Sequence, residues 1–490
     1  MFLYPQAART LVAPRRSLPG IASRALLALL VAAIVVVSAA PASGGPDRPT
    51  IGRPPGWVGS HVYHHYNDMT TELEDLQSAN SDVMALSSIG SSVRGRSLWC
   101  ARIEDPGAGQ EGKLALYLDG EHHGNEQLGG ELAILLIHHL VEDRSDALVQ
   151  QVLSQSVVYI TPMVNPDGNT RDQRDNLDGV DLNRNYPYNF TTGGMHGDSP
   201  ASEPEVRANV DFMTGADLGL YMTFHTGTVA LLYPWGDTLD PSPDKAMFEH
   251  FRGAAEAAGV TYGPSGSTLY IANGASEDFA YGALGVPAFT FEVDGQQARW
   301  ITTREDIASR LADELGLVME LLAAAPLMTA NLTASPVEIP SPVRAGEEAG
   351  FEVDLDNPSY EASNNTTVTV ELRRDGVVVR TFSETVDVPA EGTAKAVVAV
   401  TFPEAGNYEV IVRLEFRRLQ VANATNATAV LADRTVEVRG GPFGGAGGGA
   451  VLALVLVLVL AAGGFVVLRR RGALRPQRGP HPEKKGTKGG

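Results

Sequence analysis

Three hydrophobic, strand-like stretches, far apart in the chain, each end in side chains that can bind a metal. The first, Leu-Ala-Leu-Tyr-Leu-Asp-Gly-Glu-His-His-Gly-Asn-Glu, ends in His123 and Glu126. The second, Leu-Gly-Leu-Tyr-Met-Thr-Phe-His, ends in His225, and the third, Ala-Phe-Thr-Phe-Glu, ends in Glu292. Two imidazoles and a carboxylate are the protein ligands of a catalytic zinc ion that keeps its fourth position for water. Since a further carboxylate can take a proton from that water, the pattern indicates metal-assisted hydrolysis of an acyl bond.

Strand-like and helix-like segments alternate between residues 61 and 325. This alternation predicts an α/β domain with a mixed, mostly parallel sheet flanked by helices. Ligands of such sheets gather beyond the carboxyl ends of the strands, which is where the candidate metal ligands lie. We expect strands at 113–118, 156–161, 218–224 and 288–292, and helices at 67–79, 126–142, 204–214, 243–258 and 304–324.

The pattern changes in residues 326–439, where short runs alternate between apolar and polar residues and no helical period is visible. Asp375-Gly376 is a hairpin-turn signal within this segment. The pattern predicts an all-β sandwich of about seven strands, immunoglobulin-like or transthyretin-like. Because the segment contains no histidine, we expect a spacer or a module that contacts glycans or proteins.

Both ends of the chain carry long apolar runs. Residues 25–40 follow Arg15, Arg16 and Arg24 and run into Ala40-Pro41-Ala42, which predicts a signal peptide over 1–42. A Gly- and Pro-rich linker is expected over 43–60. An uncleaved signal anchor is the alternative. Residues 450–468 form a 19-residue run without a charge, long enough to span a bilayer.

The flanks of that second run predict its orientation. A Gly-rich stalk, 440–449, precedes it, and the basic tail 469–490 follows it. By the positive-inside rule this tail is cytoplasmic. We therefore expect a single-pass protein of the cell membrane with its N-terminal ectodomain outside, or shed as a secreted form.

The net charge of the chain is −20. A charge of +4 in residues 1–42 and of +7 in residues 450–490 leaves −31 for the segment between them. Such a surface repels phosphate, so nucleic acid is excluded as a partner. Cys100 is the one cysteine, which rules out an intrachain disulfide, and its strand-like surroundings predict a buried core residue.

Asn-x-Ser/Thr sequences in an exported chain are plausible glycosylation sites, and they predict a glycoprotein. They begin at Asn189, Asn331, Asn364, Asn365, Asn423 and Asn426.

A polar block lies between the first and second metal-binding stretches. Asn165-Pro-Asp-Gly is followed by Arg171 and Arg174, and residues 179–187 read Gly-Val-Asp-Leu-Asn-Arg-Asn-Tyr-Pro. In motif order and spacing, residues 61–325 resemble the zinc metallocarboxypeptidases of the pancreatic carboxypeptidase A and B type. The local His-Gly-Asn-Glu is similar to the carboxypeptidase N/E branch. The resemblance implies the metallocarboxypeptidase fold and one zinc ion per catalytic domain.

The resemblance assigns roles around the metal. His123, Glu126 and His225 match the family's zinc ligands. Glu292 matches the general base that activates the attacking water. Asp181 matches the carboxylate that orients the first histidine ligand, which is a common partner for the second ring nitrogen of a metal-bound histidine.

The resemblance also assigns residues to the substrate. Asn183 and Arg184 match the pair that grips the terminal carboxylate of the substrate, and Tyr270 matches the mobile tyrosine that closes over it. Arginine binds a carboxylate with two parallel hydrogen bonds, which suits this role. Glu277, counted from Tyr270, matches the floor of the side-chain pocket and hints at substrates ending in Lys or Arg.

Two arginines compete for a further role, polarising the scissile carbonyl and stabilising the oxyanion. Arg174 fits the spacing of the N/E branch, counted back from Asn183, and Arg171 is the alternative, by the longer spacing of the A/B branch.

These observations predict a membrane-anchored, externally facing zinc carboxypeptidase that acts on the C-termini of peptides or proteins. A zinc amidase acting on cell-wall peptides or other conjugates is the close alternative. A surface binding or adhesion protein with an inactive catalytic domain is an alternative of a different class, although the sequence keeps each metal ligand and Glu292.

Overall fold

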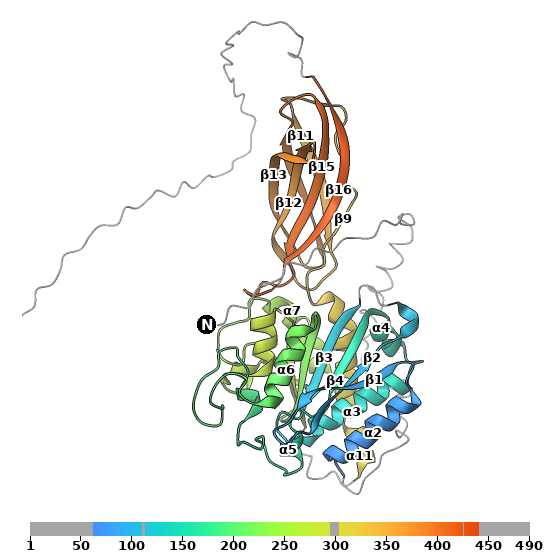
Figure 1. Cartoon of the computed structure of the whole chain (residues 1–490), viewed down its shortest axis with the longest axis vertical. Coiled ribbons are helices and arrows are strands. Elements are labelled where there is room, and N and C mark those ends of the chain that lie inside the picture. Colours follow the sequence, from blue (N-terminus) through green and yellow to red (C-terminus); the bar gives the residue numbers. More distant parts are fainter. Residues whose placement is uncertain (1–61, 110–112, 295–302, 425, 441–490) are drawn as a thin grey trace, which may run out of the picture. The chain divides into compact units, whose positions relative to one another are not determined.

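The computed structural model describes residues 62–109, 113–294, 303–424 and 426–440 (Figure 1). The expected signal peptide, linker, transmembrane segment and basic tail, and the stalk after residue 440, lie outside these residues. Among the described residues, no helix combines the length and the apolar composition needed to cross a bilayer. The described residues form an α/β region followed by a β-rich region.

An eight-stranded mixed sheet is the centre of the α/β region, in the order β1-β2-β4-β3-β5-β8-β6-β7. The four middle strands, β4, β3, β5 and β8, run parallel to one another. β2 is antiparallel to β4, and β6 is antiparallel to β8. The predicted mixed, mostly parallel sheet is therefore confirmed. The strands are β1 (Met84–Ser91), β2 (Ser97–Ile103), β3 (Leu114–Gly120), β4 (Ser156–Thr161), β5 (Leu218–Gly227), β6 (Ala230–Tyr233), β7 (Thr261–Pro264) and β8 (Ala288–Asp294).

Helices cover this sheet, and α3 packs against β3, β5 and β8. The longer helices are α2 (Tyr66–Ala79), α3 (Gln127–Glu142), α4 (Ala147–Gln155), α6 (Pro204–Gly215) and α12 (Ala312–Ala324). The shorter ones are α5 (Pro166–Asn169), α7 (Lys245–Glu249), α8 (Arg252–Ala257), α9 (Ser265–Thr268), α10 (Ser276–Asp278) and α11 (Arg304–Arg310). Single turns lie at Pro106–Ala108, Leu182–Arg184, Phe279–Ala283 and Ala325–Leu327.

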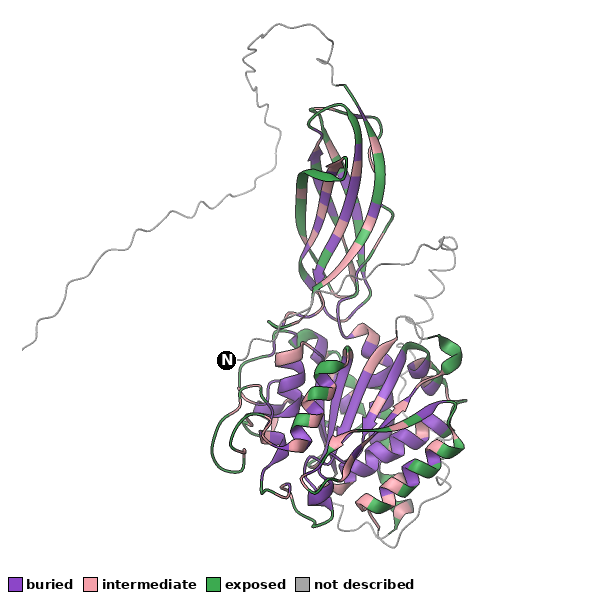
Figure 2. Cartoon of the chain, in the orientation of Figure 1, coloured by how far each residue is buried: buried purple, intermediate pink, exposed green. Residues whose placement is uncertain are grey.

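The middle strands are buried along most of their length (Figure 2). Parallel strands covered on both faces require continuous apolar runs, which the sequences of β3, β4 and β5 provide. Cys100 lies in β2 with 1% of its surface exposed, so its predicted burial is confirmed. The parallel arrangement brings the carboxyl ends of β3, β5 and β8 to the same edge of the sheet.

The β-rich region contains a five-stranded sheet, β10-β16-β15-β12-β13, and a three-stranded sheet, β14-β11-β9. Both sheets contribute to one hydrophobic core, with Phe351 and Val353 from one sheet and Val368 and Val370 from the other. Its strands are β9 (Thr333–Ala334), β10 (Val343–Arg344), β11 (Glu348–Asn357), β12 (Ser363–Arg374), β13 (Val377–Val388), β14 (Gly392–Thr401), β15 (Gly406–Arg417) and β16 (Asn426–Arg439).

The hairpin between β12 and β13 forms where the Asp-Gly signal predicted it. Asp375 and Gly376 both have positive φ, of 53° and 76°. Two consecutive residues with positive φ are the mark of the tight turn that matches the twist of a hairpin. The β-rich character of residues 326–439 is therefore confirmed, whereas its kinship with immunoglobulin or transthyretin domains stays a prediction.

Candidate active site

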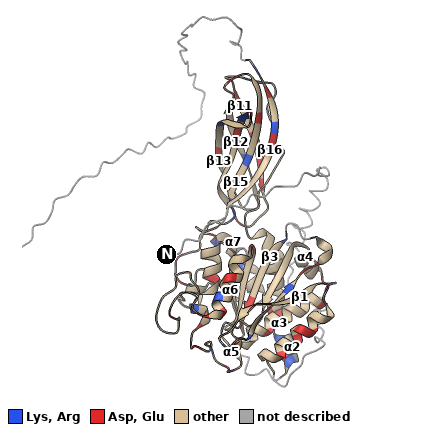
Figure 3. Ribbon diagram, viewed as in Figure 1, with Lys and Arg blue, Asp and Glu red and all other residues tan. Residues whose placement is uncertain are grey.

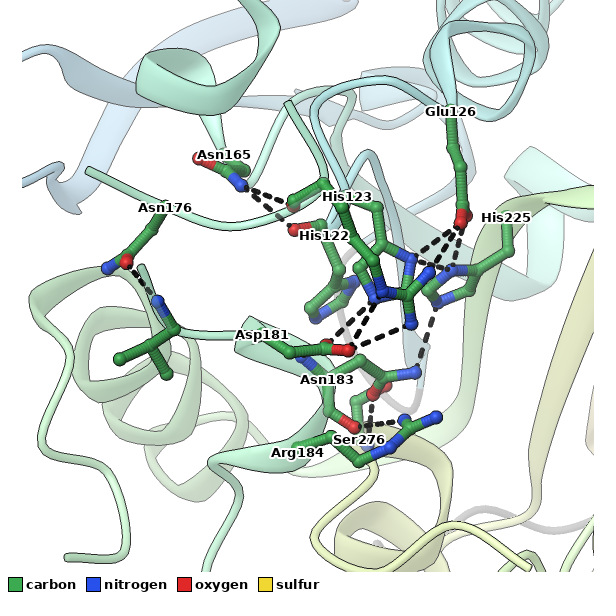
Figure 4. A network of polar contacts seen from close by, with 12 residues as sticks. His122, His123, Glu126, Asn165, Asn176, Asp181, Asn183, Arg184, His225 and Ser276 are labelled. Carbon is green, nitrogen blue, oxygen red and sulfur yellow. Dashed lines mark hydrogen bonds and ion pairs between the residues drawn. The ribbon is translucent and has the colours of Figure 1, made fainter. Parts of the chain in front are cut away.

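Three side chains converge at the carboxyl edge of the sheet. Among the described residues, His123, Glu126 and His225 are the one group of three or more His, Cys, Asp or Glu side chains whose potential ligand atoms all lie within 4.8 Å of one another. Glu126 Oε1 lies 2.8 Å from His123 Nδ1, and Glu126 Oε2 lies 2.9 Å from His225 Nδ1 (Figure 4). The two Nδ1 atoms are 3.2 Å apart.

These distances suit a tetrahedral zinc ion. With zinc–ligand bonds of about 2.0–2.2 Å, neighbouring ligand atoms of a tetrahedron lie roughly 3.3 Å apart. Burial opposes ionisation of Glu126, but the neighbouring charges and hydrogen bonds of His123 and His225 outweigh it and hold the pKa of Glu126 well below its usual range. Glu126 is therefore a carboxylate, the form in which it can bind a metal.

Each of these side chains owes its position to the end of an element. His123 follows β3, Glu126 immediately precedes α3, and His225 lies near the end of β5. His225 is the register partner of Glu292 on β8, so the parallel pairing brings Glu292 beside the metal group. A Cβ atom on Gly227 would lie 2.7 Å from Glu292 Oε2, so the glycine leaves the space that this carboxylate fills.

The environment of Glu292 favours its protonated form more than water does. Burial raises the pKa of Glu292, and the positive charge of His225 only partly offsets this effect. A carboxylate with a raised pKa is a better proton acceptor in a reaction near neutral pH.

Asp181 and Arg174 lie beside the metal group and contact each other. Asp181 Oδ1 lies 2.9 Å from His123 Nε2, and the Arg174 side chain donates to Asp181 Oδ2 and, at 3.0 Å, to Glu126 Oε1. Burial opposes ionisation of Asp181, but the bond with His123 and the charges of His123 and Arg174 hold its pKa far below the usual value. Asp181 therefore lies in hydrogen-bonding contact with the first histidine, and its role in orienting that ring stays a prediction.

Arg171 lies elsewhere in the same loop. Its guanidinium donates to the backbone oxygens of Asp167, at 3.1 Å, and Asn176, at 2.6 Å. These bonds fasten the chain that follows α5, whereas Arg174 contacts the metal group directly. The geometry favours Arg174 of the two candidates.

The residues expected to bind a substrate carboxylate lie next to His225. Asn183 Oδ1 accepts a hydrogen bond from the Ser276 N–H at 2.8 Å, and its Nδ2 lies 3.2 Å from His225 Nε2. The Arg184 guanidinium donates to the Asn183 backbone oxygen and lies 5.8 Å from the centre of the Tyr270 ring. Tyr270 is 57% exposed, and its hydroxyl accepts a hydrogen bond from the Arg184 guanidinium at 3.4 Å.

Glu277, on α10, is a buried carboxylate with an incomplete set of partners. Only 4% of its surface is exposed, and Oε2 has no hydrogen-bond partner among the described residues. A Cβ atom on Gly236 would lie 3.1 Å from its Oε1, so the glycine keeps the approach to this carboxylate open. A buried acceptor without a donor costs free energy unless a ligand supplies one.

The sequence comparisons agree with this geometry. The family model described as zinc carboxypeptidase matches residues 69–315, which is half of the chain. The chain belongs to the zinc carboxypeptidase family. The matched residues include each metal ligand and Glu292 but not the β-rich region. Zinc is thus the metal of the site formed by His123, Glu126 and His225.

Individual relatives are distant and longer than the matched region. Human carboxypeptidase A6 is 29% identical over 266 residues, which cover 47% of this chain and 60% of that protein. The catalytic chain of rat carboxypeptidase N is 29% identical over 228 residues, 38% of this chain and 50% of the relative. The chain therefore spans between half and 60% of these relatives. A crystal structure of thrombin activatable fibrinolysis inhibitor is 22% identical, with a TM-score of 0.49, over 53% of this chain and 74% of the other.

The sequence assigns no role to two residues that contact the zinc carboxypeptidase site. Asn165 is fully buried, and its amide donates to the backbone oxygens of His122 and Arg174, at 3.1 and 3.2 Å. His122 is not one of the converging ligands; its ring lies 2.7 Å from Tyr186 Oη and stacks on the ring of His225. The Asn-Pro-Asp-Gly motif was a signal for Asn165, but its partners are visible only in the folded chain.

Proposed function

We propose that this member of the zinc carboxypeptidase family removes C-terminal residues from peptides. The observation that carries the proposal is the combination, at one edge of the sheet, of the metal group, Glu292 beside it, and the Asn183–Arg184 pair next to His225. The first two suit hydrolysis of an amide bond. The third adds donors for a free carboxylate, which limits the substrate to chain ends.

The proposed reaction divides into roles for this chain's own residues. Bound zinc supplies Lewis-acid polarisation and lowers the pKa of a bound water. Glu292 accepts the proton of the attacking water and later donates it to the leaving amine. Arg174, already aligned beside Glu126, stabilises the negative charge that develops on the carbonyl oxygen.

Asn183 and Arg184 hold the terminal carboxylate in the proposed complex. When His225 binds the metal through Nδ1, its Nε2 carries the proton, so Asn183 Nδ2 has no acceptor there. The amide hydrogens of Asn183 are then available to the substrate. Tyr270 is exposed and adjacent to Arg184, and in the proposal it closes over the bound carboxylate.

We also propose a preference for C-terminal Lys or Arg, through Glu277. The support is the partnerless Oε2 of this buried carboxylate and the glycine beside it. A cationic side chain would provide the missing donors and compensate the buried charge. Export and anchoring by residues 450–468, with the catalytic region outside, are proposed from the sequence alone.

The activity test uses the full chain with zinc and a matched set of blocked dipeptides that end in Phe, Leu, Arg, Lys or Glu. We expect release of the C-terminal residue, and a fall of kcat by at least about 10³-fold in Glu292→Gln, because the substitution removes the proton acceptor and keeps its shape. Zinc content is measured in both proteins. Absence of release from each peptide by the zinc-loaded chain would overturn the proposal.

The specificity test compares Glu277→Gln with the unaltered chain. We expect kcat/KM for the Arg and Lys peptides to fall by about 10²-fold or more, with little change for Leu, because only the cationic side chain loses a charged partner. Glu256→Gln, on the exposed surface of α8, is the matched control and is expected to leave both values unchanged. Preferred release of Phe or Leu by the unaltered chain would refute the role of Glu277.

A further inference from the structure

The N-cap residue of α3 does not cap the helix with its own side chain. Glu126 is its N-cap residue, and the Glu126 side chain makes no capping hydrogen bond, because it faces the metal group. The first N–H groups of a helix have no partner within the helix and need an acceptor from elsewhere. In α3 the Gly129 N–H donates to the backbone oxygen of Glu126, at 3.1 Å, and also to a side chain of another element.

Thr226, the residue after His225 on β5, provides it. Thr226 Oγ1 accepts a hydrogen bond from the Gly129 N–H at 3.1 Å and donates one to the Glu126 backbone oxygen at 3.0 Å. The Thr226 backbone N–H donates to Glu126 Oε2 at 3.2 Å. One residue of the strand thus contacts both the backbone and the carboxylate of a metal ligand on the helix.

Gly129 allows this contact. A Cβ atom at this position would lie 2.7 Å from the Phe224 backbone oxygen and 3.3 Å from the His225 nitrogen. Since real Cβ atoms do not approach a backbone oxygen so closely, only glycine lets the first turn of α3 lie against the backbone of β5. The backbones of β5 and α3 are therefore in direct contact next to Glu126 and His225, two of the three metal ligands.

We propose that Thr226 is a positioning residue of the metal site, and that its hydroxyl, with Gly129, sets the spacing between Glu126 and His225. The inference depends on the zinc site and not on the proposed substrate. Zinc then meets ligands that are already at the right separation, so binding does not have to order them. An ordinary helix cap would add stability to the fold and leave metal affinity unchanged.

The test compares Thr226→Val, which removes the hydroxyl and keeps the shape, with Thr226→Ser, which keeps the hydroxyl. Both retain the backbone N–H of residue 226. Zinc affinity of the full chain is measured by competition with a chelator, and the melting temperature is measured both with and without zinc. We expect the zinc dissociation constant of Thr226→Val to rise about 10- to 100-fold, and that of Thr226→Ser to stay within about threefold of the unaltered chain.

Thr290→Val is the matched control. Thr290 is buried on β8, the strand next to β5, and its hydroxyl has no hydrogen-bond partner in the described part of the chain. The same substitution there is expected to leave zinc affinity unchanged.

Three results would overturn the proposal. Unchanged zinc affinity in Thr226→Val would show that the hydroxyl does not position the ligands. Equal weakening of zinc binding in Thr226→Val and Thr226→Ser would show that the hydrogen bonds of the Thr226 hydroxyl do not position the ligands. Equal loss of melting temperature with and without zinc in Thr226→Val, at constant affinity, would leave only the role of a helix cap.

Discussion

At the scale of single residues, the two candidate arginines give a sharp prediction. Arg174 contacts Asp181 and Glu126, whereas the Arg171 guanidinium donates to backbone oxygens of α5 and of the loop that follows it. We expect Arg174→Ala to lower kcat by about 10²- to 10³-fold, the usual effect of removing one oxyanion donor, with a smaller change in KM. Steady-state kinetics on the best of the blocked dipeptides provide the measurement.

Arg171→Ala is the comparison for this prediction, with an expected loss of less than about fivefold, since it loosens the loop without touching the metal group. Zinc content must be equal in both variants, because Arg174 also contacts a ligand. A larger loss in Arg171→Ala than in Arg174→Ala would reverse the assignment.

At the scale of elements, the helices and strands of residues 61–325 could be predicted from the sequence where the apolar pattern was long and continuous along the chain. β4 has the predicted bounds, and α3 begins one residue late, because each is a long buried run between polar residues. β6 and β7 were missed, since four residues show no period and their pairing is with distant strands. The helix predicted over 304–324 divides into α11 and α12.

The residues of the candidate site also fall into two groups, those that the sequence indicates and those that only the fold shows. His123, Glu126, His225 and Glu292 could be found because residue type and the end of a strand occur together in the sequence. Thr226 could not be found, since its role exists only where β5 meets the start of α3. Residues that touch the metal leave a local pattern, and residues that position them depend on contacts between distant segments.

At the scale of the whole molecule, a buried histidine cluster joins the start of the described chain to two helices. It consists of His64, Glu72 of α2, and Glu131 and His138 of α3, each at most 3% exposed. His64 lies 2.9 Å from both Glu72 Oε2 and Glu131 Oε2, and His138 lies 2.8 Å from Glu72 Oε1. The charged residues of α2 are all acidic (Figure 3).

The fold favours the protonated form of His64 and the ionised form of Glu72. Burial alone would lower the pKa of His64, but the charge of Glu131 and the hydrogen bonds with Glu131 and Glu72 raise it to about 10. Burial would raise the pKa of Glu72, but hydrogen bonds with His138 and His64 lower it to about 2. Arg304 of α11, 3.3 Å from His64 Nε2, opposes protonation of His64, and the two carboxylates outweigh it.

The stability of the fold should therefore depend on pH on both sides of neutrality. The raised pKa of His64 contributes stability that is complete below about pH 6.5, its value in the unfolded chain, and is lost as the pH rises toward 10. The lowered pKa of Glu72 contributes stability that is present above 4.5 and is lost as the pH falls toward 2. The cluster thus contributes most to the stability of the fold at weakly acidic pH, between about 4.5 and 6.5.

Unfolding by urea at pH 6.5 and 8.5 measures this effect. Between these values, a single bound proton changes the free energy of unfolding by about 1.4 kcal/mol per pH unit. From pH 6.5 to 8.5, we expect the free energy of unfolding to fall by about 1–3 kcal/mol more in the unaltered chain than in His64→Gln. The reason is that only the unaltered chain keeps the extra proton when folded. His139→Gln is the control on α3, since His139 pairs with Asp143 outside the cluster. If His64→Gln loses as much stability as the unaltered chain, His64 is neutral in the folded protein, and the cluster is held by hydrogen bonds without a net charge on His64.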